Sequence, residues 1–80
     1  MLNNLAYAHS RMDNNAKALG YAMRALKLAP NNPSVMDTAG WLLVETGGDR
    51  SRALDLLRAA ARKAPDNTTI RAHLDAAEKG

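Results

Sequence analysis

The side chains that could do chemistry are few and widely separated along the sequence. The three serines, Ser10, Ser34 and Ser51, have no histidine at a spacing typical of hydrolases, whereas a serine nucleophile needs a base within hydrogen-bond reach. The two histidines, His9 and His73, stand near opposite ends of the chain, and cysteine is absent, which excludes disulfides and thiolate metal ligands. The sequence therefore predicts no enzyme activity, no metal site and no cofactor.

The histidines and the glycine pair have structural interpretations instead. We expect His9 to be a partly buried structural residue and His73 to lie on a helix surface. Gly47 and Gly48 follow no strand, so they indicate a turn between helices and not a phosphate-binding loop.

Short breaks divide the chain into segments that fit helices. The chain has 80 residues and a formal net charge of +3, and its many alanines and leucines favour helix over strand. Clusters of glycine, proline, aspartate and asparagine mark breaks at 13–15, 30–33, 47–49 and 65–67. The segments between them are about 2–12, 15–28, 33–46, 50–64 and 68–79. We expect an all-α chain of five helices, and no apolar run approaches the ~20 residues that span a bilayer.

Local signals mark where these helices begin and end. Pro33 suits a first helical turn, where its missing N–H is not needed. Gly47 is placed to end a helix in the left-handed conformation, and Asp49 fits the N-cap of the next helix. Apolar residues recur at helical spacing, as in Val35, Met36, Ala39, Leu42 and Leu43 of the third segment.

An internal repeat relates the second segment to the fourth. At a shift of 35 residues the identical pairs are Ala18 and Ala53, Leu19 and Leu54, Ala25 and Ala60, Ala29 and Ala64, Pro30 and Pro65, and Asn32 and Asn67. A shift of 34 aligns the first segment with the third and sets Tyr7 opposite Trp41. The unit is a helix pair of about 34 residues, whose two helices would approach closely where Gly40 faces Ala53.

These residues resemble the tetratricopeptide repeat family, whose helical hairpin has small residues at its contact points and a proline at its end. The resemblance implies an all-α, right-handed solenoid of antiparallel helical hairpins within a single domain, 1–80. The first repeat would span about 1–32, the second about 33–67, and a capping helix about 68–79, as a fragment of a longer array. Asp75 departs from the pattern, which has a small residue there. The solvent-facing side of the capping helix would carry Arg71, Asp75, Glu78 and Lys79.

A narrower resemblance rests on four strings of residues. They are Gly40-Trp41-Leu42-Leu43-Val44, the Gly-Asp at 48–49, Arg-Ala-Leu-Asp-Leu-Leu-Arg at 52–58 and Ala-Pro-Asp-Asn at 64–67. They look like the C-terminal repeats of bacterial tetratricopeptide lipoproteins associated with PEP-CTERM protein sorting and exopolysaccharide export. That likeness implies an envelope-anchored parent with periplasmic repeats, and a cytoplasmic location is the alternative.

The tetratricopeptide resemblance also places the outward side chains of each first helix on a concave surface. The candidate peptide-binding residues there are Asn3, Tyr7, Ser10, Arg11, Asp37, Trp41 and Glu45. Tyr7 and Trp41 occupy equivalent positions and would lie side by side, flanked by polar groups, as anchors of a recognition surface. The alternative for Trp41 is that it packs between helices as part of the core.

These observations leave three functions open. The favoured one is a non-catalytic scaffold that holds a peptide or protein segment in the concave groove. The alternative is a structural spacer or self-association module that acts through its stacking ends and would form a homo-oligomer. A third and weaker one is nucleic-acid binding through the basic convex residues Arg24, Lys27, Arg58, Arg62 and Lys63, which have no interleaved aromatic rings. We expect no small-molecule substrate.

Overall fold

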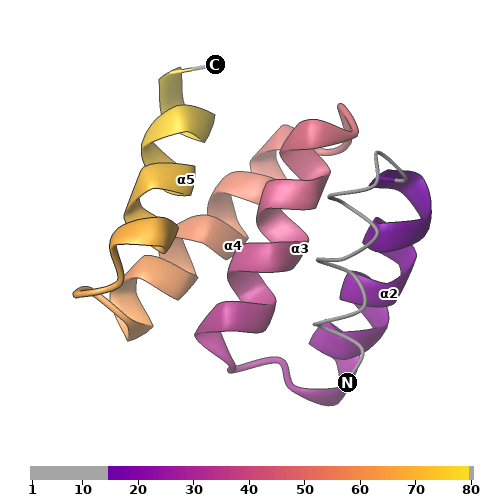
Figure 1. Cartoon of the computed structure of the whole chain (residues 1–80), viewed down its shortest axis with the longest axis horizontal. Helices are drawn as coiled ribbons and strands as arrows, with labels where there is room; N and C mark the ends of the chain where they lie inside the picture. The colour runs from indigo at the N-terminus through magenta and orange to yellow at the C-terminus, as the bar shows by residue number, and fades with distance from the viewer. Residues whose placement is uncertain (1–14, 80) are drawn as a thin grey trace.

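Within residues 15–79, four α-helices form where the sequence pattern predicts them. The computed structural model describes residues 15–79, and its helices are α2 (Asn15–Leu28), α3 (Pro33–Glu45), α4 (Arg50–Lys63) and α5 (Thr68–Lys79). Successive helices alternate in direction (Figure 1). The described residues contain no strand, so the all-α prediction is confirmed for them. The expected first helix, at about 2–12, lies outside the described residues.

Side-chain caps fix the starts of α3 and α4. The Asn32 carboxamide oxygen accepts hydrogen bonds from the backbone N–H groups of Ser34 and Val35, at 2.9 and 3.2 Å. Asp49 accepts from the N–H of Arg52 at 3.1 Å and is the N-cap of α4, as predicted. These bonds satisfy N–H groups that have no partner within the helix.

Glycine ends α3 in the conformation that the sequence predicts. Gly47 has a φ of +70°, a value that L side chains rarely adopt. Its N–H donates to the Val44 carbonyl at 3.2 Å, and the Gly48 N–H donates to the Leu43 carbonyl at 2.8 Å. This pair of bonds is the Schellman motif, and it allows α4 to start five residues after α3 ends.

Two turns of the chain repeat the same hydrogen bonds 35 residues apart. The Asn32 N–H donates to the Ala29 carbonyl at 3.2 Å, and the Asn67 N–H donates to the Ala64 carbonyl at 3.0 Å. Asn67 also accepts from the Ile70 N–H at 3.0 Å, as Asn32 does from Val35. The internal repeat of the sequence therefore corresponds to equivalent turns, after α2 and after α4.

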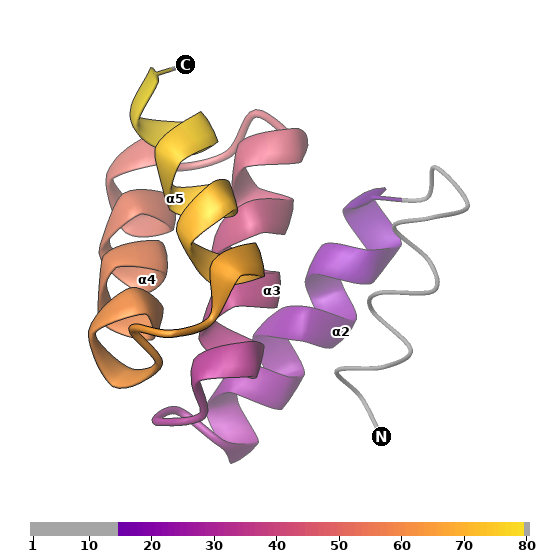
Figure 2. The same cartoon turned by 60° about the vertical axis from the view of Figure 1, so that its left-hand side comes forward.

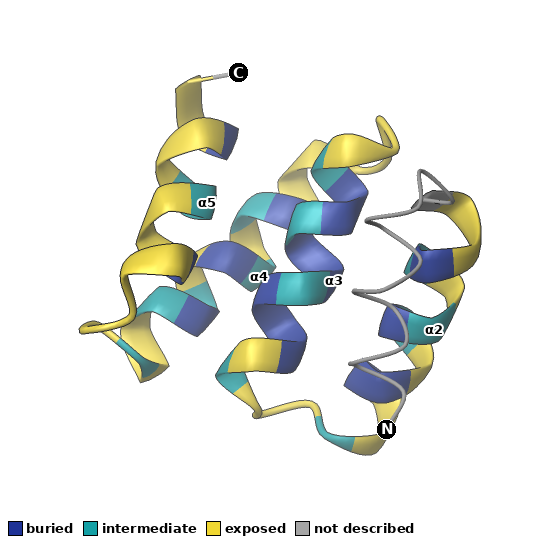
Figure 3. Cartoon of the chain, in the orientation of Figure 1, coloured by how far each residue is buried: buried dark blue, intermediate teal, exposed yellow. Residues whose placement is uncertain are grey.

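Helix α3 is the centre of the packing. It contacts α2, α4 and α5, and α4 also contacts α5. Helices α2 and α5 lie on opposite sides of α3 in two views of the molecule (Figures 1 and 2). Buried residues occur around more of α3 than of the other helices (Figure 3); they are Val35, Met36, Asp37, Ala39, Gly40, Leu42 and Leu43.

The contact between α3 and α4 is close because Gly40 has no side chain. A Cβ atom built on Gly40 would lie 3.0 Å from Leu57 Cγ, 3.1 Å from the Ala53 carbonyl oxygen and 3.2 Å from Leu56 Cβ. The predicted pairing of Gly40 with Ala53 is thus confirmed. Helix axes approach to about 8 Å only where such small residues meet.

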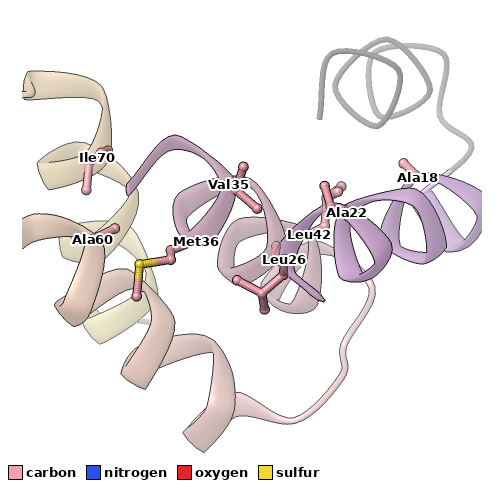
Figure 4. Packing of buried hydrophobic residues seen from close by; sticks show 10 residues of the cluster. Ala18, Ala22, Leu26, Val35, Met36, Leu42, Ala60 and Ile70 are labelled. Atoms are coloured by element: carbon pink, nitrogen blue, oxygen red, sulfur yellow. The ribbon is translucent and has the colours of Figure 1, made fainter. Parts of the chain in front are cut away.

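Small and branched apolar side chains fill the space between the helices. The central cluster joins Ala18, Ala22 and Leu26 of α2 to Val35, Met36 and Leu42 of α3, and continues to Ala60 and Ile70 (Figure 4). Full burial of each leucine or isoleucine contributes roughly 1.5–3 kcal/mol. None of the helices of residues 15–79 has the length and apolar character that a membrane crossing requires.

Candidate functional site

A groove of about 560 Å³ lies between α3 and α5, and we refer to it as the α3–α5 groove. Helix α3 lines it with Ser34, Asp37, Thr38, Trp41, Leu42 and Glu45. Helix α5 and the residue before it line it with Asn67, Thr69, Ile70 and His73. The volume falls within the ~300–1,000 Å³ range typical of ligand pockets.

Helical spacing brings the lining residues of α3 to one face. Asp37, Trp41 and Glu45 are each four residues apart, and residues three or four apart are neighbours on a helix surface. Leu42 and Ile70 are 1% and 2% exposed and contribute the apolar floor. The groove thus has a buried apolar base with polar side chains around it.

A hydrogen-bonded pair joins the two sides of the groove. His73 Nδ1 lies 2.9 Å from Asp37 Oδ1 and 3.0 Å from Oδ2. Because a carboxylate only accepts hydrogen bonds, we assign the proton to Nδ1, which donates to both oxygens. Asp37 is only 7% exposed, and a carboxylate removed from water to that extent requires such a partner.

The indole of Trp41 stacks on the same imidazole. The ring centroids of Trp41 and His73 are 4.4 Å apart, and the ring planes differ by 11°. Asp37 therefore holds the imidazole from α3, while Trp41 covers one face of it, one turn further along α3. Trp41 is partly buried and lines the groove, so it combines contact with a neighbouring helix and access to the groove.

The charged side chains that line the groove are acidic, whereas the net charge of the chain is positive. Among the described residues, the lining of the groove contains two carboxylates, Asp37 and Glu45, and no lysine or arginine. The chain as a whole has a formal net charge of +3. Glu45 is exposed, whereas Asp37 is enclosed and already paired with His73.

Three of the seven predicted binding residues line the α3–α5 groove: Asp37, Trp41 and Glu45. The other four, Asn3, Tyr7, Ser10 and Arg11, lie outside the described residues. Asp37 lines the groove, but its carboxylate is buried against α5 and bonded to His73, which the sequence did not predict. Trp41 was expected either to anchor the groove or to pack between helices as part of the core. It has features of both, since it stacks on His73 of α5 and also lines the groove. Binding in this groove stays a prediction.

Sequence reasoning misplaced His73. It was expected on a helix surface, but its side chain is only 25% exposed and is bonded to Asp37. One signal could have identified it: a shift of 35 residues aligns His73 with Thr38, and both line the groove. The repeat predicts positions in this way, although it does not predict which side chains pair.

The groove contains a serine, a histidine and an aspartate, the residue types of a hydrolase triad, so we compared their geometry with that of a nucleophile and its base. Ser34 lines it together with His73 and Asp37, yet no hydrogen bond joins the Ser34 hydroxyl to the imidazole. A nucleophile and its base are usually about 2.6–3.2 Å apart. Between residues 15 and 79, no three histidine, aspartate or glutamate side chains come together that could hold a metal ion.

Comparison with known families gives no assignment. No protein-family model matches this sequence. The site must therefore be interpreted from its own geometry: an accessible indole, a buried carboxylate–imidazole pair, an exposed carboxylate and several hydroxyl and amide groups around an apolar floor.

Proposed function

We propose that this chain is a protein-interaction module of the tetratricopeptide type, without a catalytic role, and that its α3–α5 groove holds a segment of a partner protein. The observation that carries the proposal is the position of Trp41. Its partly buried indole lines a groove that has polar side chains around it. Large aromatic side chains in such surroundings are frequent anchors of protein interfaces.

The repeated turns and the close helix contact support a stack of helical hairpins. Equivalent turns follow α2 and α4, and Gly40 brings α3 against α4. In a right-handed solenoid built this way, α3 and α5 are equivalent first helices of consecutive units. Their outward sides would then form the concave wall, and α5 would be the capping helix.

The lining offers two kinds of contact to an extended segment. The side chains of Ser34, Thr38, Asn67 and Thr69 line the groove and carry hydroxyl or amide groups, which can bond to the backbone N–H and C=O groups of a peptide. Trp41 gives an apolar surface for one large side chain of the segment. Backbone contacts would supply affinity, and the indole would supply selectivity.

The exposed charges of α5 favour the groove over the alternative of end-to-end stacking. Its outward residues Arg71, Asp75, Glu78 and Lys79 are all exposed, as expected from the sequence. A charged face of this kind is solvated at little cost, whereas burying it against another helix would remove four charged groups from water. The groove, by contrast, presents an aromatic ring beside apolar surface.

Trp41 is the single tryptophan of the chain, so its fluorescence reports on the groove directly. Random peptides displayed on phage would be selected on the immobilised 80-residue chain, and the enriched peptides titrated into the protein in solution. We expect a saturable change in Trp41 emission. Trp41→Ala should weaken binding about thirtyfold by calorimetry, because loss of an anchor costs about 2 kcal/mol.

Leu28→Ala is the matched control. Leu28 is 77% exposed, ends α2 and does not line the groove, so its loss should leave the affinity unchanged. Far-UV circular dichroism would show that both variants keep their helices. The proposal fails if enriched peptides bind Trp41→Ala as tightly as the parent, or if no peptide is enriched.

A further inference from the structure

We infer that the α3–α5 groove selects a cationic side chain, an arginine or lysine of the bound segment. This inference rests on the proposed function and adds the chemical class of the ligand. Its basis is the sign of the charges: Glu45 and Asp37 line the groove, and none of the lysines and arginines of residues 15–79 does. In a chain with a net charge of +3, this is a distinct local field.

Glu45 is the charged acceptor that a ligand can reach. It is exposed and lines the groove, and no other described side chain forms an ion pair with it. Asp37 contributes negative charge from below, but its oxygens are already occupied by His73. A guanidinium or ammonium group would therefore bond to Glu45 and gain further attraction from the enclosed carboxylate.

His73 offers a second acceptor on the opposite side of the groove. Its Nδ1 proton is directed at Asp37, so when the ring carries that proton alone, Nε2 presents a lone pair. Within residues 15–79, Nε2 forms no hydrogen bond. An N–H group of a bound cation matches this atom, whereas a carboxylate or carbonyl oxygen does not.

Trp41 lies between the two carboxylates along α3 and suits the same ligand. It is four residues from each of them, which places all three on one face of the helix. The alkyl part of arginine or lysine packs on apolar surface while the charge stays near water. An indole also attracts cations through its ring electrons.

A second hollow on α5 lacks this acidic bias. It is formed with α4, and the charged residues that line it are Arg58, Arg62, Arg71, Asp66 and Asp75. Arg58 is paired with Glu78, whose Oε2 lies 3.4 Å from its Nε, so Arg62 and Arg71 remain against Asp66 and Asp75. This hollow is therefore balanced in charge, whereas the described lining of the α3–α5 groove has carboxylates and no arginine or lysine, and a charge difference of this kind controls specificity and encounter rate.

The test compares peptide selection on the parent chain and on Glu45→Gln. We expect arginine or lysine to recur at one position among peptides enriched on the parent, and not among those enriched on the variant. Replacing that residue of an enriched peptide by glutamine should weaken binding to the parent about tenfold. Against Glu45→Gln the same replacement should matter only about twofold, because the partner charge is gone.

Asp55→Asn is the control for overall charge. Asp55 is exposed on α4, outside the groove, so it changes the net charge as Glu45→Gln does and should leave the preference intact. Enriched peptides that bind through Trp41 but have neutral or acidic residues at every recurrent position would overturn this inference while leaving the groove function standing. If no peptide is enriched, both fail.

Discussion

The Asp37 carboxylate is nearly enclosed, and hydrogen bonds from a single imidazole compensate for its burial. Only 7% of the residue is exposed, and aspartate is seldom buried without a partner. His73 donates from Nδ1 to both oxygens and stacks on Trp41. The pair therefore links α3 to α5 and also sets the position of the indole, so the shape of the α3–α5 groove depends on it.

Removing His73 should destabilise the fold. His73→Ala leaves the Asp37 carboxylate buried without a donor, and we expect a loss of about 1–3 kcal/mol in the free energy of unfolding. His73→Asn should lose less, because its amide N–H replaces the donor of the imidazole. Urea unfolding followed by far-UV circular dichroism measures both values.

A double-mutant cycle isolates the contact itself. Asp37→Ala combined with His73→Ala should lose less stability than the sum of the single changes, by about 1 kcal/mol. Strictly additive losses would show that the hydrogen bonds between these two side chains add nothing to stability.

At the scale of elements, α3 differs from the other helices because it is packed on several sides. The face that contains Gly40 lies against α4 so closely that a side chain has no room. Gly20 on α2 presents the opposite case, since a Cβ there would meet no atom of residues 15–79 within 4 Å. The two glycines give a matched test of whether close packing or helix propensity decides the effect of adding a methyl group.

Gly40→Ala should destabilise the protein and Gly20→Ala should stabilise it. Alanine favours a helix by about 0.8–1 kcal/mol over glycine, and that gain is realised at Gly20. At Gly40 the added methyl meets the Ala53 carbonyl oxygen at 3.1 Å, and backbone cannot yield as a side chain does, so overpacking of about 1–3 kcal/mol outweighs it. Thermal unfolding measures both. A rise in stability for Gly40→Ala would contradict the close approach of α3 and α4.

The sequence predicted these elements well because their signals are local. Pro33, Gly47 and Asp49 act within a few residues of themselves, and each stands where it was expected. The pairing of Asp37 with His73 spans 36 residues and depends on how α5 lies against α3. No local pattern encodes that angle, so the pairing of Asp37 with His73 was not predicted, and His73 was expected on a helix surface. Asp37, Trp41 and Glu45 line the groove, and they were candidates because of the tetratricopeptide resemblance.

At the scale of the whole molecule, the repeat shows that α5 lacks the apolar stripe with which α3 contacts α4. A shift of 35 residues aligns Met36, Gly40 and Leu43 of α3 with Arg71, Asp75 and Glu78 of α5. The three residues of α3 are buried, and Gly40 marks this stripe as the face against α4. The three residues of α5 are exposed. Aligned positions are thus an apolar contact in α3 and an exposed surface in α5.

Giving α5 the stripe of α3 should convert that surface into an interface. In the triple variant Arg71→Met, Asp75→Gly and Glu78→Leu, the outer face of α5 would be apolar, and two copies would bury it against each other. We expect reversible association in sedimentation velocity at concentrations where the parent does not associate through this face. Arg71→Gln with Glu78→Gln, which removes the charges of the outer two positions without adding apolar side chains, is the control and should behave as the parent does. A triple variant that keeps its helical circular dichroism and sediments as the parent does would show that the stripe does not specify helix contact. The proposed equivalence of α3 and α5 would then lose its physical basis.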